Sequence, residues 1–149
     1  MSKELDTYIT ELNNFADNLD EIVSDIFIDY EESILDKTIK KRLLDTGFDA
    51  EGSLIGDGEY SALAIHVKEL RGQETGHMTL FHDGGFHDAM FFGKSGKDLI
   101  LESKDWKSGL LKETYGNAIL DLNETEINFI IKWTVDPELQ KIINNFKLS

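Results

Sequence analysis

The chain has 149 residues, which suits a single domain and is enough to bury a hydrophobic core. It has no cysteine, which excludes disulfide bonds, thiolate metal sites and cysteine nucleophiles. Its 29 acidic residues outnumber 15 Lys and Arg, giving a net charge of −14, so we expect no direct nucleic-acid partner and no anionic membrane partner. The charge either maintains solubility or faces a basic partner. The first residues lack the apolar core of a signal peptide, so we expect synthesis in the cytosol.

The positions of the glycines divide the chain into three zones of one domain, 1–149. All twelve lie between Gly47 and Gly116. The zones are a helical segment, 1–46, a glycine-rich α/β middle, 47–122, and a second helical segment, 123–149. The expected fold class is α+β, with N-terminal helices, a small central antiparallel sheet and C-terminal helices.

The first zone has a helical period. Its apolar residues recur at steps of three and four, and they include Leu5, Tyr8, Ile9, Leu12, Phe15, Leu19, Ile22, Val23, Ile26, Phe27 and Tyr30. One helix over the whole zone would be about 65 Å long at about 1.5 Å per residue. We therefore expect a break near Asp29–Glu32 that gives two helices, the second ending before Gly47.

The middle zone predicts a short helix over Glu59–Leu70 and two extended segments, Met78–Phe81 and Asp88–Phe92, joined by a turn at Gly84–Gly85. Ala89–Phe92 and Asp98–Ser103 read as the arms of a β-hairpin. A third strand is expected around Asn117–Leu122.

The last zone is helical again. Asn123 with Glu126 has the pattern of a capping box. Asp136 followed by Pro137 predicts that a further helix restarts there, with Asp136 as its N-cap. Apolar residues at helical spacing follow on both sides of this point.

The candidate chemical site is a histidine cluster. His77, His82 and His87 are spaced five residues apart, and Asp83 and Asp88 each follow a histidine. Imidazole and carboxylate groups are ligands of zinc and other divalent metals. Steps of five place successive side chains on opposite faces of a strand, so we favour hydrogen-bonding or surface roles and expect no metal and no other cofactor.

Two groups of residues are candidates for protein contacts. Met90, Phe91 and Phe92 are consecutive, so a strand there presents large apolar groups on both faces. One face can pack on the helices and leave the other for a neighbouring subunit, or both faces can be buried within the monomer. Gly84 and Gly85 form the expected turn, in which one glycine has positive φ. Without positive φ, close approach of a partner would explain them better.

The middle zone also contains a series of short signals in a characteristic order: Gly52, Tyr60-Ser61, Ile65, Lys68, Thr79-Leu80, Asp83-Gly84-Gly85-Phe86 and Asp88-Ala89-Met90. This order resembles the tail-completion, or virion morphogenesis, proteins of tailed bacteriophages, over about residues 30–145 in sequence of elements. The chain departs from the family pattern in three ways. The usual Trp-Pro pairing is missing, Gly84 replaces the threonine before the glycine, and Ala89 replaces a serine.

The resemblance implies a non-enzymatic structural protein of the phage neck or tail end, a head–tail connector or tail-completion protein. It implies assembly in the host cytoplasm into the virion, as a homo-oligomeric ring in contact with other virion proteins. Two alternatives stay open. One is a metal-binding protein or metal-dependent hydrolase that uses the histidine cluster. The other is an acidic phage protein that sequesters a basic host protein.

Overall fold

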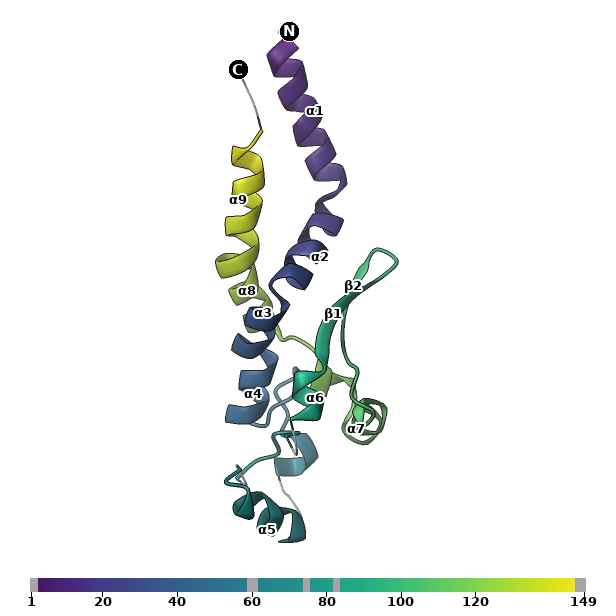
Figure 1. Ribbon diagram of the computed structural model, residues 1–149, viewed down its shortest axis with the longest axis vertical. Coiled ribbons are helices and arrows are strands. Elements are labelled where there is room, and N and C mark those ends of the chain that lie inside the picture. Colours follow the sequence, from purple (N-terminus) through teal and green to yellow (C-terminus); the bar gives the residue numbers. More distant parts are fainter. Residues whose placement is uncertain (1–2, 59–61, 74–75, 82–83, 147–149) are drawn as a thin grey trace.

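The computed structural model describes residues 3–58, 62–73, 76–81 and 84–146 (Figure 1). The fold is elongated and helix-rich, with a two-stranded antiparallel sheet in its middle. N-terminal and C-terminal helices run side by side, and both ends of the chain lie at the same end of the molecule. This arrangement confirms the predicted α+β class. None of the described helices is long and apolar enough to cross a lipid bilayer.

The first zone forms four helices, α1 (Lys3–Asp17), α2 (Leu19–Asp29), α3 (Glu31–Lys37) and α4 (Ile39–Asp45). The predicted break is present at Tyr30, and further breaks occur at Asn18 and Thr38. The carbonyl of each break residue accepts the first helical bond of the next helix, from Ile22 N to Asn18 O, Ile34 N to Tyr30 O and Arg42 N to Thr38 O. The chain therefore bends at these points without turning back, and the four helices form one long column (Figure 1).

The last zone forms α8 (Glu124–Ile130), a π turn (Ile131–Val135) and α9 (Asp136–Asn144). The predicted capping box is confirmed, because the Asn123 side chain accepts from Glu126 N and the Glu126 side chain accepts from Asn123 N. The predicted helix α9 begins at Asp136 with Pro137 in its first turn, but the prediction that Asp136 is its N-cap is wrong. Asp136 has helical dihedrals, and its N–H donates to Ile131 O across the wider π turn. The helix therefore continues into α9 although Pro137 has no N–H to donate.

The middle zone contains the hairpin of β1 (Met90–Ser95) and β2 (Asp98–Ser103), as predicted. The register pairs Met90 with Ser103 and Ser95 with Asp98. Short helices surround it: a 3-10 turn at Ile55–Gly58, α5 (Ala62–Leu70), α6 (Gly85–Asp88) and α7 (Ser108–Tyr115). The predicted helix over 59–70 is thus present as α5, while 59–61 lie outside the described residues.

Three expectations for this zone are wrong. The described segment Met78–Phe81 forms no strand, and Asp88 ends the helical turn α6 that precedes β1. The third strand is also absent, since Asn117–Leu120 forms a 3-10 turn. In that turn Ile119 and Leu120 are buried in the core, and the carbonyl of Ala118 accepts from Ala50 N. The segment is thus held by the packing of these side chains and by one backbone hydrogen bond, and not by the series of backbone hydrogen bonds that pairs a strand with its neighbour.

The core lies where the column crosses the hairpin. Phe27 on α2 meets Phe92 on β1 edge to face, with 5.2 Å between ring centroids. Ile39 and Leu43 from α4 are fully buried beside Ile119. The other buried apolar side chains are Ile26, Ile34, Leu35, Ile55, Met78, Phe86, Met90, Leu120, Ile130 and Val135. The core therefore joins all three zones, while α1 and α9 extend beyond it.

Candidate functional site

Two of the three clustered histidines are described, and each hydrogen-bonds to a backbone carbonyl. His77 Nε2 lies 2.6 Å from Leu44 O, and His87 Nε2 lies 2.8 Å from Thr79 O. His82 lies outside the described residues. Within the part of the chain that the structure describes, no group of three His, Asp or Glu side chains could hold a metal ion. His77 and His87 thus secure the segment that leads into α6.

His87 is the most constrained titratable group of this segment. Its side chain is 2% exposed and lies against the Phe81 ring, with 5.4 Å between centroids. Burial lowers the pKa of His87, since an imidazolium would be desolvated there, while the bond to Thr79 O and the charge of Asp88 oppose this. Nδ1 has no hydrogen-bond partner among the residues that the structure describes. A buried acceptor left without a donor lowers the stability of the fold by about 1–3 kcal/mol.

The Met90–Phe92 strand divides its side chains between two faces. Met90 and Phe92 are buried in the core, so they are not available to a partner. Phe91 lies on the other face, half-buried, with Lys104 Nζ 4.9 Å from its ring centroid. Of the two arrangements left open by the sequence, the structure has the one in which a single face packs on the helices.

The Gly84–Gly85 turn is present, but it leads into a helix instead of joining two strands. Gly84 has φ 86° and precedes α6, of which Gly85 is the first residue. A Cβ at Gly84 would lie 3.2 Å from Phe81 and 3.3 Å from Asp88. Gly84 is buried. Its role is backbone geometry and close internal packing, not contact with a partner.

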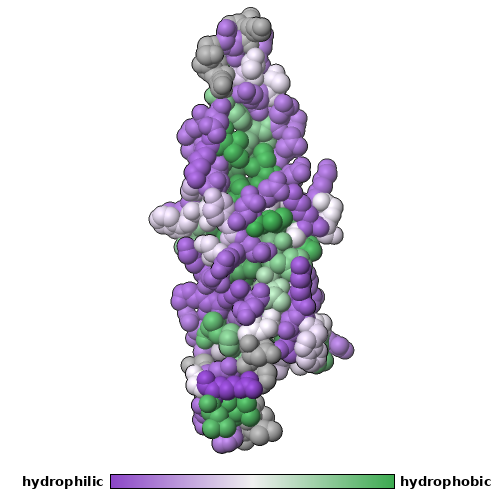
Figure 2. Space-filling model, viewed as in Figure 1, coloured by the Kyte–Doolittle hydropathy of each residue, from purple (hydrophilic) through white to green (hydrophobic). Residues whose placement is uncertain are grey.

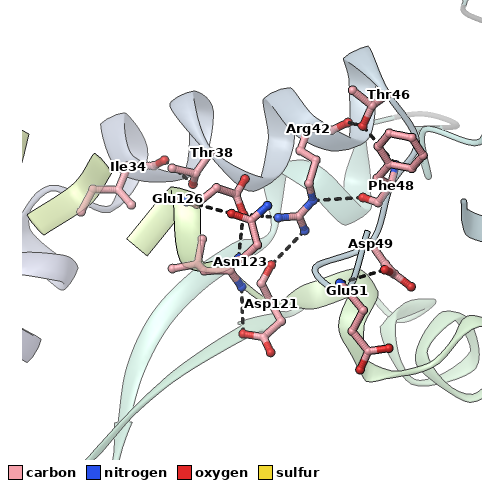
Figure 3. A network of polar contacts seen from close by, with 11 residues as sticks. Ile34, Thr38, Arg42, Thr46, Phe48, Asp49, Glu51, Asp121, Asn123 and Glu126 are labelled. Atoms are coloured by element: carbon pink, nitrogen blue, oxygen red, sulfur yellow. Dashed lines mark hydrogen bonds and ion pairs between the residues drawn. The ribbon is translucent and has the colours of Figure 1, made fainter. Parts of the chain in front are cut away.

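A buried polar network fixes the ends of the three zones to one another (Figure 3). The guanidinium of Arg42 on α4 pairs with Glu126 and also donates to Phe48 O and Asp121 O, at 3.0 and 2.9 Å. Burial lowers the pKa of Arg42, and the nearby carboxylates of Glu126, Asp49 and Asp121 oppose that shift. Through these contacts Arg42 connects α4 to the loop at Phe48 and to the start of α8.

The helices beyond the core carry apolar stripes with little cover. Neither α9 nor the described side chains of α1 include a buried residue. Phe146 packs edge to face on Tyr8 and Phe15, with 6.4 and 5.7 Å between centroids. Leu5 and Ile9 remain exposed. Figure 2 shows a hydrophobic strip with hydrophilic borders along this two-helix arm, which we define as α1 together with α9.

Both tryptophans of the chain are on the surface. Trp106, just before α7, is 83% exposed, and Trp133 in the π turn is 63% exposed. Tryptophan is a residue that folded proteins mostly cover, and it is enriched at the centres of protein interfaces. The sequence analysis missed Trp106. Its signal was a single large aromatic between lysines and an aspartate, in Lys104-Asp105-Trp106-Lys107.

The polar groups described above bond within the chain, while several large apolar side chains lie on the surface. The clustered histidines that the structure describes bond to the backbone, and the Arg42 network is internal. The arm and the two tryptophans are among the exposed apolar features, which also include Leu70 and Leu110. Comparisons of the chain with known protein families, with curated proteins and with solved structures found no match.

Proposed function

We propose that the chain is a structural subunit of the neck or tail end of a tailed bacteriophage, acting through protein–protein contacts. The observation that carries the proposal is the two-helix arm, whose amphipathic helices cover one another only in part. The order of short signals in the middle zone supports the phage assignment. A tubular virion is built from rings, and a head-to-tail ring needs two complementary surfaces on each subunit.

The arm favours a partner on physical grounds. Most of the stability of a helix in a protein comes from packing its apolar face, and isolated short helices are marginal in water. Leu5 and Ile9 are each more than a third exposed. Because full burial of such a side chain contributes about 1.5–3 kcal/mol, covering the remaining surface contributes about 0.5–1 kcal/mol per residue. A neighbouring helix on this strip therefore stabilises both the arm and the assembly.

The net charge of −14 makes assembly depend on ionic strength. Like-charged subunits repel one another at low salt, and this repulsion is screened as the ionic strength rises. We therefore expect a monomer or weak oligomer of the isolated chain, and a ring on the particle. The metal-hydrolase alternative gains no support from the described residues, in which His77 and His87 are engaged by carbonyl groups.

The test places the same charge on two sides of α1. Ile9→Lys puts a cation on the apolar strip, and Asn14→Lys puts one on the exposed face away from it, since the two positions are five residues apart. Ile9→Lys should abolish incorporation of the chain into particles, measured by mass spectrometry of purified virions. Asn14→Lys should leave incorporation intact. Equal incorporation of both variants would remove the arm from the proposal.

A further inference from the structure

The loop that carries Trp106 is held by hydrogen bonds of Asp105. Lys107 N donates to Asp105 Oδ1 at 2.9 Å, and Ser108 N donates to Asp105 O at 3.0 Å. Asp105 N in turn donates to the buried Ser103 hydroxyl at 3.3 Å. The exposure of the indole is therefore a fixed feature of the loop between β2 and α7. A loop whose backbone is already ordered loses little conformational freedom on binding, so this loop is suited to insertion into a partner.

The surroundings of Trp106 specify what it would bind. Lys104, two residues before it, is exposed and has no ion-pair partner within the described residues. Lys107 Nζ lies 5.8 Å from the indole centroid. The indole N–H is a donor that can never accept, and no acceptor for it lies in the described part of the chain. Trp106 thus presents an apolar ring, one unused donor and flanking cations.

A cleft of about 390 Å³ lies between α4 and α6 and has the complementary properties. Leu44 and Phe81 contribute apolar walls, and His87 lines it as well. Its carboxylates are Asp36, Asp45 and Asp88, and its two cations are Lys40 and Lys41.

The charges of this cleft are only partly neutralised within the subunit. Lys40 pairs with Asp36 at 3.5 Å, and Lys41 pairs with Asp45. Asp88 is exposed and has no ion pair within the described residues. The cleft therefore keeps one carboxylate for a cation from outside.

His87, in the wall of the cleft, is hydrogen-bonded within the subunit. A carbonyl oxygen only accepts, so the bond between His87 Nε2 and Thr79 O places the ring proton on Nε2. Nδ1 then carries a lone pair, but it is buried, and it has no partner among the described residues. What the cleft offers to another molecule is therefore its apolar walls and the Asp88 carboxylate, which match an indole ring with a neighbouring lysine.

The two surfaces lie apart on the molecule. In Figure 1, α7 lies on the far side of α6 from α4, and Trp106 is not among the described residues that line the cleft. Two different complementary patches on separate sides of one subunit are the requirement for a head-to-tail contact. We propose that Trp106 of one copy inserts into the α4–α6 cleft of the next copy, with Lys104 facing Asp88. This inference rests on the proposed assembly function and names the partner as a second copy of the chain.

The experiment measures self-association of the full chain by sedimentation at high salt, where the net charge is screened. Trp106→Ala should raise the dissociation constant by about 30-fold or more, as expected for a central interface tryptophan. Trp106→Phe keeps an aromatic ring and loses part of the apolar contact area, so it should give a smaller rise of about 2- to 12-fold. Trp133→Ala is the matched control, and it should leave the constant unchanged.

A mixing experiment isolates the head-to-tail geometry. Leu44→Arg blocks the cleft and leaves the Trp106 loop intact, while Trp106→Ala leaves the cleft intact. Each variant alone should remain monomeric, and an equal mixture should form a 1:1 dimer that grows no further. Two outcomes would overturn the inference: a mixture without dimer, or a wild-type chain that stays monomeric in the same conditions. Loss of association in Ile9→Lys but not in Trp106→Ala would reject this contact and leave the proposed function standing.

Discussion

Arg42 on α4 and Glu126 in the first turn of α8 form an ion pair across 84 positions of the sequence, with 9% and 11% of their side chains exposed. The same guanidinium donates to Phe48 O and Asp121 O. One side chain therefore connects the end of the first zone, the start of the middle zone and the start of the last zone.

Arg42→Met should lower the free energy of unfolding by about 3–5 kcal/mol, because it leaves the Glu126 carboxylate buried without its partner. Lys41→Met is the control, since its pair with Asp45 is exposed and such pairs contribute about 0–1 kcal/mol. Urea denaturation of both variants measures the difference. A cost for Arg42→Met no larger than that for Lys41→Met would contradict the structural role of the network.

The buried His87 predicts a pH dependence. Because burial lowers its pKa in the folded state, the unfolded chain binds the proton first as the pH falls below about 6.5. The stability from this group is complete above that pH, and it is lost by up to about 1.4 kcal/mol per pH unit until the lower folded-state pKa is reached. The charged groups that act on His87 are Lys40, Lys68 and Asp88.

Gln at position 87 keeps an N–H donor for Thr79 O and does not titrate. The difference in unfolding free energy between the wild type and His87→Gln, taken from urea titrations, should therefore shrink between pH 7.5 and pH 5.5 as the wild type loses its advantage. Carboxylates elsewhere affect both proteins alike and cancel in the difference. A difference that stays constant over this range would argue against a neutral, buried His87.

The turn before α6 predicts a strain effect. Gly84→Val should destabilise the fold by about 1–3 kcal/mol, because a β-branched residue is forced to positive φ. The added atoms also approach Phe81 and Asp88. Gly85→Ala, one position later inside α6, should be neutral or slightly stabilising. Thermal unfolding compares the two, and similar losses in both would show that φ is not the cause.

Metal content separates the histidine alternatives. Since His77 and His87 use Nε2 to reach carbonyl oxygens, we expect far less than one equivalent of zinc, iron, nickel or manganese in protein purified without chelator. Elemental analysis gives the measurement. A stoichiometric metal that disappears in His82→Ala would instead promote the metal-binding alternative.

Local signals in the sequence predicted the parts of the fold that depend on neighbours in the chain. The capping box at Asn123, the hairpin around Gly96 and the break at Tyr30 each follow from a few adjacent residues. The errors arise where distant contacts decide. Ile119 and Leu120 form a 3-10 turn in place of a strand, and this turn buries their side chains in the core. Asp136 is not an N-cap because the π turn before it continues the helix.

The candidate surfaces were less accessible to sequence reasoning. Periodicity identified the apolar stripe of α1, but it could not show that α9 covers it only in part. The position of the Trp106 loop depends on the hydrogen bonds of Asp105, and the α4–α6 cleft depends on how these two helices lie relative to each other. These are properties of tertiary packing, which single-residue patterns do not contain.

The central claim is that the chain is a building block of the virion, and cryo-microscopy of purified particles tests it most directly. With the chain identified in the same particles by mass spectrometry, we predict a ring of identical subunits at the neck or tail end, in which the Trp106 loop of each copy meets α4 and α6 of the next. Absence of the chain from mature particles would contradict the account.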